Sequence, residues 1–192
     1  MAEQSGNLTG AREAMRKSVA AAPDWGPGLL ELALLLARQN QFKEAVETAE
    51  KVAALEPKNL MVLAGVVDIA HRAGHKEMAI KHLRRGLVLV PGDLQLSQLL
   101  AQDLSALNQH EEALQLWTAL IEANPKNEPA LLGRVKTLLA AGKPAKAVAD
   151  TTTLLALAPG DSLYAYYTAL AHVITPAHQP VELNRQLFDG MA

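Results

Sequence analysis

Three neighbouring histidines have the side-chain type and the spacing that could hold a metal ion. His71 and His75 are four residues apart, and His82 follows. Two imidazoles with this spacing on one helix can share a zinc ion. Gly74 stands between the first two, where we expect a helix to end, and no carboxylate completes a zinc-protease pattern. We therefore predict no metal site, with one histidine in a groove and two on the surface.

A short basic segment, Lys-His-Leu-Arg-Arg at residues 81–85, is a second candidate for chemistry. It is compatible with a phosphate or an acidic partner. We favour a solvated helix face, because nucleic-acid-binding proteins carry a larger basic excess and the formal net charge here is −2. The sequence thus predicts no nucleic-acid partner.

The residue types give no indication of covalent catalysis. The chain has no cysteine, which removes thiolate catalysis, disulfides and zinc–cysteine sites together. Ser162 and the threonines at 151–153 lie near no recognisable histidine pattern. We expect that this chain is not an enzyme and that it holds no cofactor.

A 34-residue period supplies the elements that position these side chains. Five prolines are spaced 34 residues apart, and three more columns keep the same register. An alanine stands 12 residues before each proline, a Gly or Asn 17 residues before it, and an Asn or Asp two residues after each of the last four. The columns are Pro23, Pro57, Pro91, Pro125 and Pro159; Ala11, Ala45, Ala79, Ala113 and Ala147; Gly6, Asn40, Gly74, Asn108 and Gly142; and Asn59, Asp93, Asn127 and Asp161.

Each column has a mechanical role in a pair of helices, here named helix A and helix B. Asn and Asp cap the first turn of helix A. Gly or Asn ends helix A, because its last turn often needs a left-handed residue. The small alanine lets helix B approach helix A, and proline cannot continue helix B. With apolar residues at helical spacing in each segment, the period predicts an all-α chain of antiparallel helix pairs.

These columns resemble the tetratricopeptide repeat (TPR) family, which has an alanine in helix B and a terminal proline. The family's signature Trp, Gly and Tyr places are mostly Leu, Ala or Val here, so the repeats are degenerate. The resemblance covers about residues 6–175 and implies a right-handed solenoid of about 11 helices. It divides the chain into a half repeat at 1–25 (helix B only, with Gly6 at a turn), repeats at 26–59, 60–93, 94–127 and 128–161, and a divergent fifth repeat with a capping helix at 162–192.

The resemblance also implies a binding groove, because helix A of each repeat lines the inner surface of such a solenoid. Its mixed apolar, amide and charged side chains suit a peptide or a helix of a partner protein. A chaperone-type carboxylate clamp is not expected, because leucines stand where it needs cationic and amide donors. The groove places are Leu30, Leu34, Arg38, Asp68, His71, Arg72, Gln98, Gln102, Ser105, Lys136 and Tyr166.

The C-terminal end of the chain raises alternatives. Residues 183–192 resemble the junction at which TPR repeats of bacterial proteins precede a class I methyltransferase domain. The chain would then be the substrate-recruiting or oligomerising region of an S-adenosylmethionine-dependent enzyme, although it contains no glycine-rich cofactor loop itself. A scaffold of a secretion or envelope assembly is a third reading. Tyr164, Tyr166 and Tyr167 in the last helix A indicate either buried cap packing or an exposed binding patch.

Location and assembly follow from the remaining features. No apolar run reaches the roughly 18 residues of a membrane helix, so we expect no membrane insertion. The polar N-terminus and the missing cysteine favour the cytoplasm, with the periplasm as the alternative. A half repeat leaves apolar helix surface uncovered, which favours an end-to-end homodimer.

Overall fold

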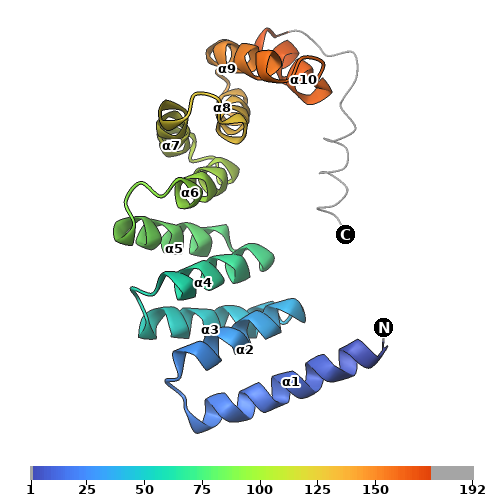
Figure 1. The fold of residues 1–192 in the computed structure, drawn as a ribbon, viewed down its shortest axis with the longest axis vertical. Coiled ribbons are helices and arrows are strands. Elements are labelled where there is room, and N and C mark those ends of the chain that lie inside the picture. Colours follow the sequence, from blue (N-terminus) through green and yellow to red (C-terminus); the bar gives the residue numbers. More distant parts are fainter. Residues whose placement is uncertain (1, 174–192) are drawn as a thin grey trace. The chain divides into compact units, whose positions relative to one another are not determined.

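The computed structural model describes residues 2–173, and this range contains ten α-helices and no strand (Figure 1). The all-α prediction is confirmed, while the expected capping helix and the methyltransferase-like junction lie outside the described residues. Each of the ranges 26–59, 60–93, 94–127 and 128–161 holds one pair of helices. The helices are α1 (Ala2–Ala21), α2 (Gly26–Arg38), α3 (Phe42–Leu55), α4 (Leu60–Arg72), α5 (Lys76–Leu89), α6 (Leu94–Ala106), α7 (His110–Ala123), α8 (Glu128–Ala140), α9 (Pro144–Leu157) and α10 (Ser162–Ala171).

The turn between the two helices of each pair has the left-handed backbone that the Gly/Asn column predicts. After α2, the N–H of Gln41 donates to the carbonyl of Leu36 at 2.9 Å, which closes the end of the helix. The same bond recurs after α4, α6 and α8. The turn residues are Asn40 (φ +58°), Gly74 (+73°), Asn108 (+59°) and Gly142 (+68°).

The Asn/Asp column caps the start of each following helix A. The Asn59 side-chain oxygen accepts hydrogen bonds from the backbone N–H groups of Met61 at 3.0 Å and Val62 at 3.4 Å. These are two of the N–H groups that a helix start otherwise leaves without a partner. Asp93, Asn127 and Asp161 accept equivalent bonds.

The alanine column is buried in four of its five places. Ala45, Ala79, Ala113 and Ala147 are fully buried. Ala11 is exposed, because no helix precedes α1 in the described residues. The turn expected at Gly6 is wrong: Gly6 lies within α1, which runs without a break from residue 2 to residue 21.

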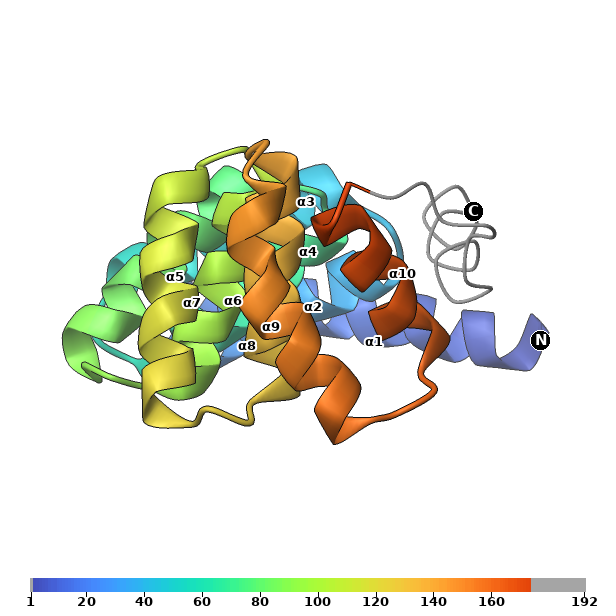
Figure 2. The same ribbon diagram turned by 90° about the horizontal axis from the view of Figure 1, so that it is seen from above.

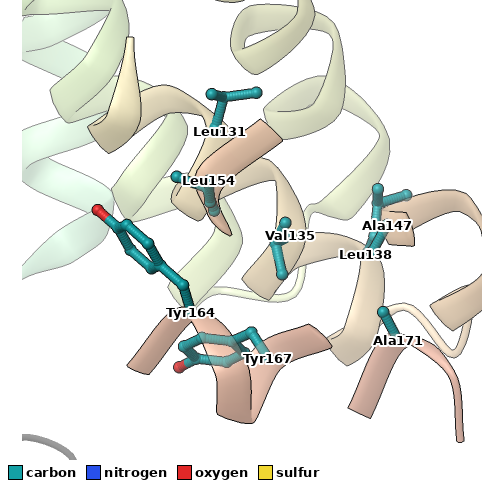
Figure 3. Packing of buried hydrophobic residues seen from close by; sticks show 8 residues of the cluster. All are labelled: Leu131, Val135, Leu138, Ala147, Leu154, Tyr164, Tyr167 and Ala171. Carbon is teal, nitrogen blue, oxygen red and sulfur yellow. The ribbon is translucent and has the colours of Figure 1, made fainter. Parts of the chain in front are cut away.

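The chain forms two compact units, residues 1–96 and 97–192. In the first unit, α2 packs against α1, α3 and α4, and α4 also packs against α3 and α5. In the second, α8 packs against α7, α9 and α10, which can be followed in Figures 1 and 2. Leu131 and Val135 of α8, Leu154 of α9 and two tyrosines of α10 form the core there (Figure 3).

Candidate functional site

A groove runs along one face of α8 in the second unit. Its main hollow has a volume of about 630 Å³, and an adjoining hollow of about 290 Å³ shares four of its lining residues. We call the two together the α8 groove. It is lined by Gln102, Ser105 and Ala106 of α6, Trp117 of α7, Glu128, Pro129, Leu132, Gly133, Lys136, Thr137 and Ala140 of α8, and Tyr164 of α10.

The floor of the α8 groove is the indole of Trp117 against the backbone of α8. Trp117 is 1% exposed. A Cβ atom at Gly133 would lie only 2.5 Å from Cζ2 of the indole, far inside van der Waals contact. The missing side chain at Gly133 therefore lets the ring reach α8.

Two hydroxyl groups hold the indole in place. Nε1 of Trp117 donates to Oγ1 of Thr137 at 3.1 Å and lies 3.4 Å from Oγ of Ser105. The two hydroxyl oxygens are 2.8 Å apart, and each is also tied to a backbone carbonyl of its own helix. A buried indole N–H needs such a partner, so this network fixes the ring orientation.

Lys136 brings a positive charge to the middle of the groove. Its side chain is half-buried, and Nζ lies 5.7 Å from the centre of the Tyr167 ring. Burial lowers the pKa of Lys136, because desolvation disfavours the charged form. Within residues 2–173 no carboxylate is paired with it.

Glu128 places a negative charge at the beginning of α8. Its Oε2 accepts a hydrogen bond from the Tyr164 hydroxyl at 2.7 Å. Burial, with this hydrogen bond as the second cause, raises the pKa of Tyr164 to about 12. No cation of the described chain is paired with Glu128.

Of the eleven groove residues predicted from the sequence, Gln102, Ser105 and Lys136 line the α8 groove. Gln98 is half-buried on α6. Tyr166 is half-buried on α10, where its ring meets that of Tyr167 edge-on at 5.5 Å.

The six predicted places on α2 and α4 belong to the first unit. Leu30 is half-buried over Gly65, where a Cβ would meet its Cδ1 at 2.7 Å. Asp68 accepts an ion-paired hydrogen bond from Arg72 at 2.9 Å, and both are exposed. Their role in binding stays a prediction. The others are Leu34, which is half-buried, and Arg38 and His71, which are exposed.

Nine residues of the groove lining lie outside the eleven predicted places, among them Trp117, Glu128, Gly133 and Tyr164. Trp117 belongs to a helix B, for which the sequence indicates only core packing. A glycine in the interior of α8 was the available signal, because an interior glycine weakens a helix and indicates close approach of another group. Tyr164 and Tyr167 are 9% and 7% exposed, so buried packing holds for these two (Figure 3).

The basic segment 81–85 is tied to α3 rather than forming a wholly solvated face. His82, expected on the surface, is fully buried, and its Nε2 lies 3.3 Å from Oε1 of Glu50. Lys81 pairs with the same carboxylate at 2.9 Å, and Arg85 donates to the carbonyls of Ala53 and Pro57. Burial lowers the pKa of His82, although contact with Glu50 opposes that shift.

Metal ligands do not gather in the part of the chain that the structure describes. Gly74, with φ of +73°, separates His71 at the end of α4 from His75 before α5. Residues 2–173 contain no group of three or more His, Asp or Glu side chains that could hold an ion. Their helices also include none with the length and apolarity to span a bilayer.

Two family models, both described as tetratricopeptide repeat, match residues 30–93 and residues 104–171. Together they cover more than half of the chain. No curated protein matches the sequence.

Solved structures share the fold at low sequence identity. A crystal structure of MamA is 19% identical, with a TM-score of 0.67 over 80% of this chain and 84% of that one. YrrB, described as a TPR protein with an unusual peptide-binding site, is 16% identical, with a TM-score of 0.70 over 85% and 84%. A tetratricopeptide repeat protein from Parabacteroides merdae is 19% identical, with a TM-score of 0.71 over 88% and 68%.

Proposed function

This chain belongs to the tetratricopeptide repeat family, and we propose that it is an interaction module that binds a peptide or helix of a partner protein along its helices A. The observation that carries the proposal is the α8 groove, which is built mainly from residues of three successive helices A, namely α6, α8 and α10. Peptide binding in the similar YrrB structure supports the same use of the fold.

The lining of the α8 groove suits a polypeptide better than a small apolar ligand. Leu132, Pro129 and Trp117 offer apolar surface for a side chain of the partner. The exposed amide of Gln102 can both donate to and accept from a peptide backbone. Apolar pockets with a few placed polar groups are how grooves of this kind recognise extended or helical segments.

The two tryptophans provide a direct test. A library of random 12-residue peptides is selected for binding to the whole chain, and the enriched peptides are titrated while indole N–H signals are followed by NMR. We expect the signal of Trp117 in the second unit to shift. Trp25, at the start of α2 in the first unit, serves as the internal reference.

Matched variants one repeat apart locate the binding surface. Gln102 and Asp68 occupy the same place of successive repeats, and both are exposed. Because Gln102 lines the α8 groove, we expect Gln102→Lys to abolish peptide binding with unchanged helicity in circular dichroism, whereas Asp68→Lys tests the first unit separately. Unchanged binding by Gln102→Lys, or selected peptides that leave Trp117 unaffected, would place the site elsewhere and refute the proposal.

A further inference from the structure

Glu128, Leu132 and Lys136 form a stripe along α8 whose two ends carry opposite charges. These residues are spaced by four, so they share one face of the helix, and all three line the α8 groove. The apolar residue stands midway between the charges. Gly133, beside Leu132, adds no side chain to this middle part, where the Trp117 indole occupies the space that a Cβ would need.

Neither charge of the stripe is neutralised by an ion pair within the described residues. The partner of Glu128 is the neutral hydroxyl of Tyr164, and Nζ of Lys136 lies 5.7 Å from the centre of the uncharged Tyr167 ring. A half-buried cation without a carboxylate is costly, and an incoming carboxylate would repay that cost. Charge complementarity therefore calls for a ligand with an acidic group at one end and a basic group at the other.

The helix sets the distance between those two groups. Eight residues separate Glu128 from Lys136, which corresponds to about 12 Å along the axis of α8 at about 1.5 Å per residue. An extended peptide rises about 3.3 Å per residue, so it covers this distance in about four residues. In an extended chain, residues i, i+2 and i+4 point to the same side. Two charges four residues apart, with an apolar residue midway, would then all face α8.

We propose that the α8 groove selects an internal, extended segment of a partner protein with the pattern basic–x–apolar–x–acidic, in either chain direction. The acidic side chain pairs with Lys136, the apolar side chain lies over Leu132 and Gly133, and the basic side chain pairs with Glu128. This inference rests on the proposed function and adds the chemistry of the ligand.

The first arm of the test uses short peptides with acetylated and amidated ends. Arg-Ser-Leu-Ser-Glu between Gly-Ser flanks is compared with Arg-Leu-Ser-Ser-Glu, which has the same composition, and with the versions in which Gln replaces Glu or Arg. Binding is measured by fluorescence anisotropy and by the Trp117 indole signal. Loss of either charge should weaken binding about fivefold, the upper range of a partly exposed ion pair. If only a free-acid peptide binds, the carboxylate comes from a chain end and the internal segment is refuted.

The second arm uses the protein to reverse the preference. Lys136→Glu should bind Arg-Ser-Leu-Ser-Arg better than Arg-Ser-Leu-Ser-Glu, whereas the native chain should prefer the latter. A residue with a purely structural role would lose binding to both peptides and gain none. Lys136→Gln, with unchanged helicity, is the matched neutral control and should show no strong preference.

The outcomes separate the two proposals. This inference is overturned if the library peptides shift the indole signal of Trp117 but lack the charge pattern. It is also overturned if those peptides bind Lys136→Glu as well as they bind the native chain, and in both cases the proposed interaction module remains. If no peptide shifts Trp117, both proposals fail.

Discussion

Gly133→Ala is the substitution that tests most directly how the α8 groove is built. In the interior of an exposed helix, alanine is more stable than glycine by roughly 0.5–1 kcal/mol, because it loses less conformational freedom on folding. At this place the new Cβ would lie 2.5 Å from Cζ2 and 2.7 Å from both Cε2 and Cη2 of Trp117. The expected sign therefore depends on whether the indole can move.

The surroundings of Trp117 hold the ring where it is. Its N–H is bonded to Thr137 at 3.1 Å, and the ring is 1% exposed. Overpacking a rigid site costs about 1–3 kcal/mol. Three ring atoms are affected, so the upper part of that range applies, and the net loss in the free energy of unfolding should be about 2 kcal/mol.

Gly65 is a matched control, because it occupies the same place two repeats earlier. A Cβ there meets the Cδ1 of Leu30 at 2.7 Å, which is the far end of a flexible side chain. Leu30 can change its rotamer at low cost. Gly65→Ala should therefore be neutral or stabilise the chain by up to about 1 kcal/mol.

Trp117→Leu completes the test as a double-mutant cycle. The smaller side chain removes the contact, so Gly133→Ala in that background should show the helix gain alone. The coupling energy between the two places should then be about 2–3 kcal/mol. Urea unfolding followed by circular dichroism gives all four free energies. If Gly133→Ala stabilises the native chain as much as Gly65→Ala does, the indole is not a fixed floor and our account of the groove is wrong.

Three further predictions concern stability. Asp150 is 4% exposed and accepts hydrogen bonds from Arg134 at 2.6 and 2.7 Å, so Arg134→Met leaves a buried carboxylate without its cation. The substitution should lower the free energy of unfolding, measured by thermal unfolding, by about 3–5 kcal/mol, and adding Asp150→Leu should restore most of that stability. The pKa of buried His82 is lowered from 6.5, so below that pH the imidazole takes up a proton more readily in the unfolded chain than in the folded one. The free energy of unfolding should therefore fall between pH 7 and pH 5, and His82→Gln should reduce this dependence on pH. Asn127→Ala should cost about 1 kcal/mol and speed amide exchange at Ala130, whose N–H loses its acceptor.

The backbone of the repeats follows from the sequence because each column acts locally. An Asn or Asp cap, a left-handed Asn or Gly and a small alanine each satisfy a requirement within one helix pair. Asn40 and Asn108 show this well, since both adopt positive φ at the places where Gly74 and Gly142 do. A 34-residue period repeats these requirements, so one unit predicts the next.

The buried polar contacts could not be predicted in this way, because they depend on pairs of residues rather than on one column. Positions 48, 82, 116 and 150 share one place of the repeat and hold Thr, His, Leu and Asp. His82 finds Glu50 on α3, 32 residues earlier, whereas Asp150 finds Arg134 on α8, 16 residues earlier. A polar side chain is stable in such a place only where its neighbour supplies a partner. The sequence does not say which neighbour that is.

The place of Lys136 in the repeat behaves in the opposite way to the structural columns. The residues one repeat apart there are Leu34, Asp68, Gln102, Lys136 and Leu170, which are apolar, acidic, amide, basic and apolar in turn. None of the helix ends depends on this place, so its chemistry can change without cost to the backbone. Where the residue reaches a hollow, as Gln102 and Lys136 do, we expect that freedom to determine which ligand fits. On this proposal the fold depends on the places that repeat, and ligand choice on the place that does not. Exchanging Lys136 for another member of its own column should therefore alter binding while the helices stay intact.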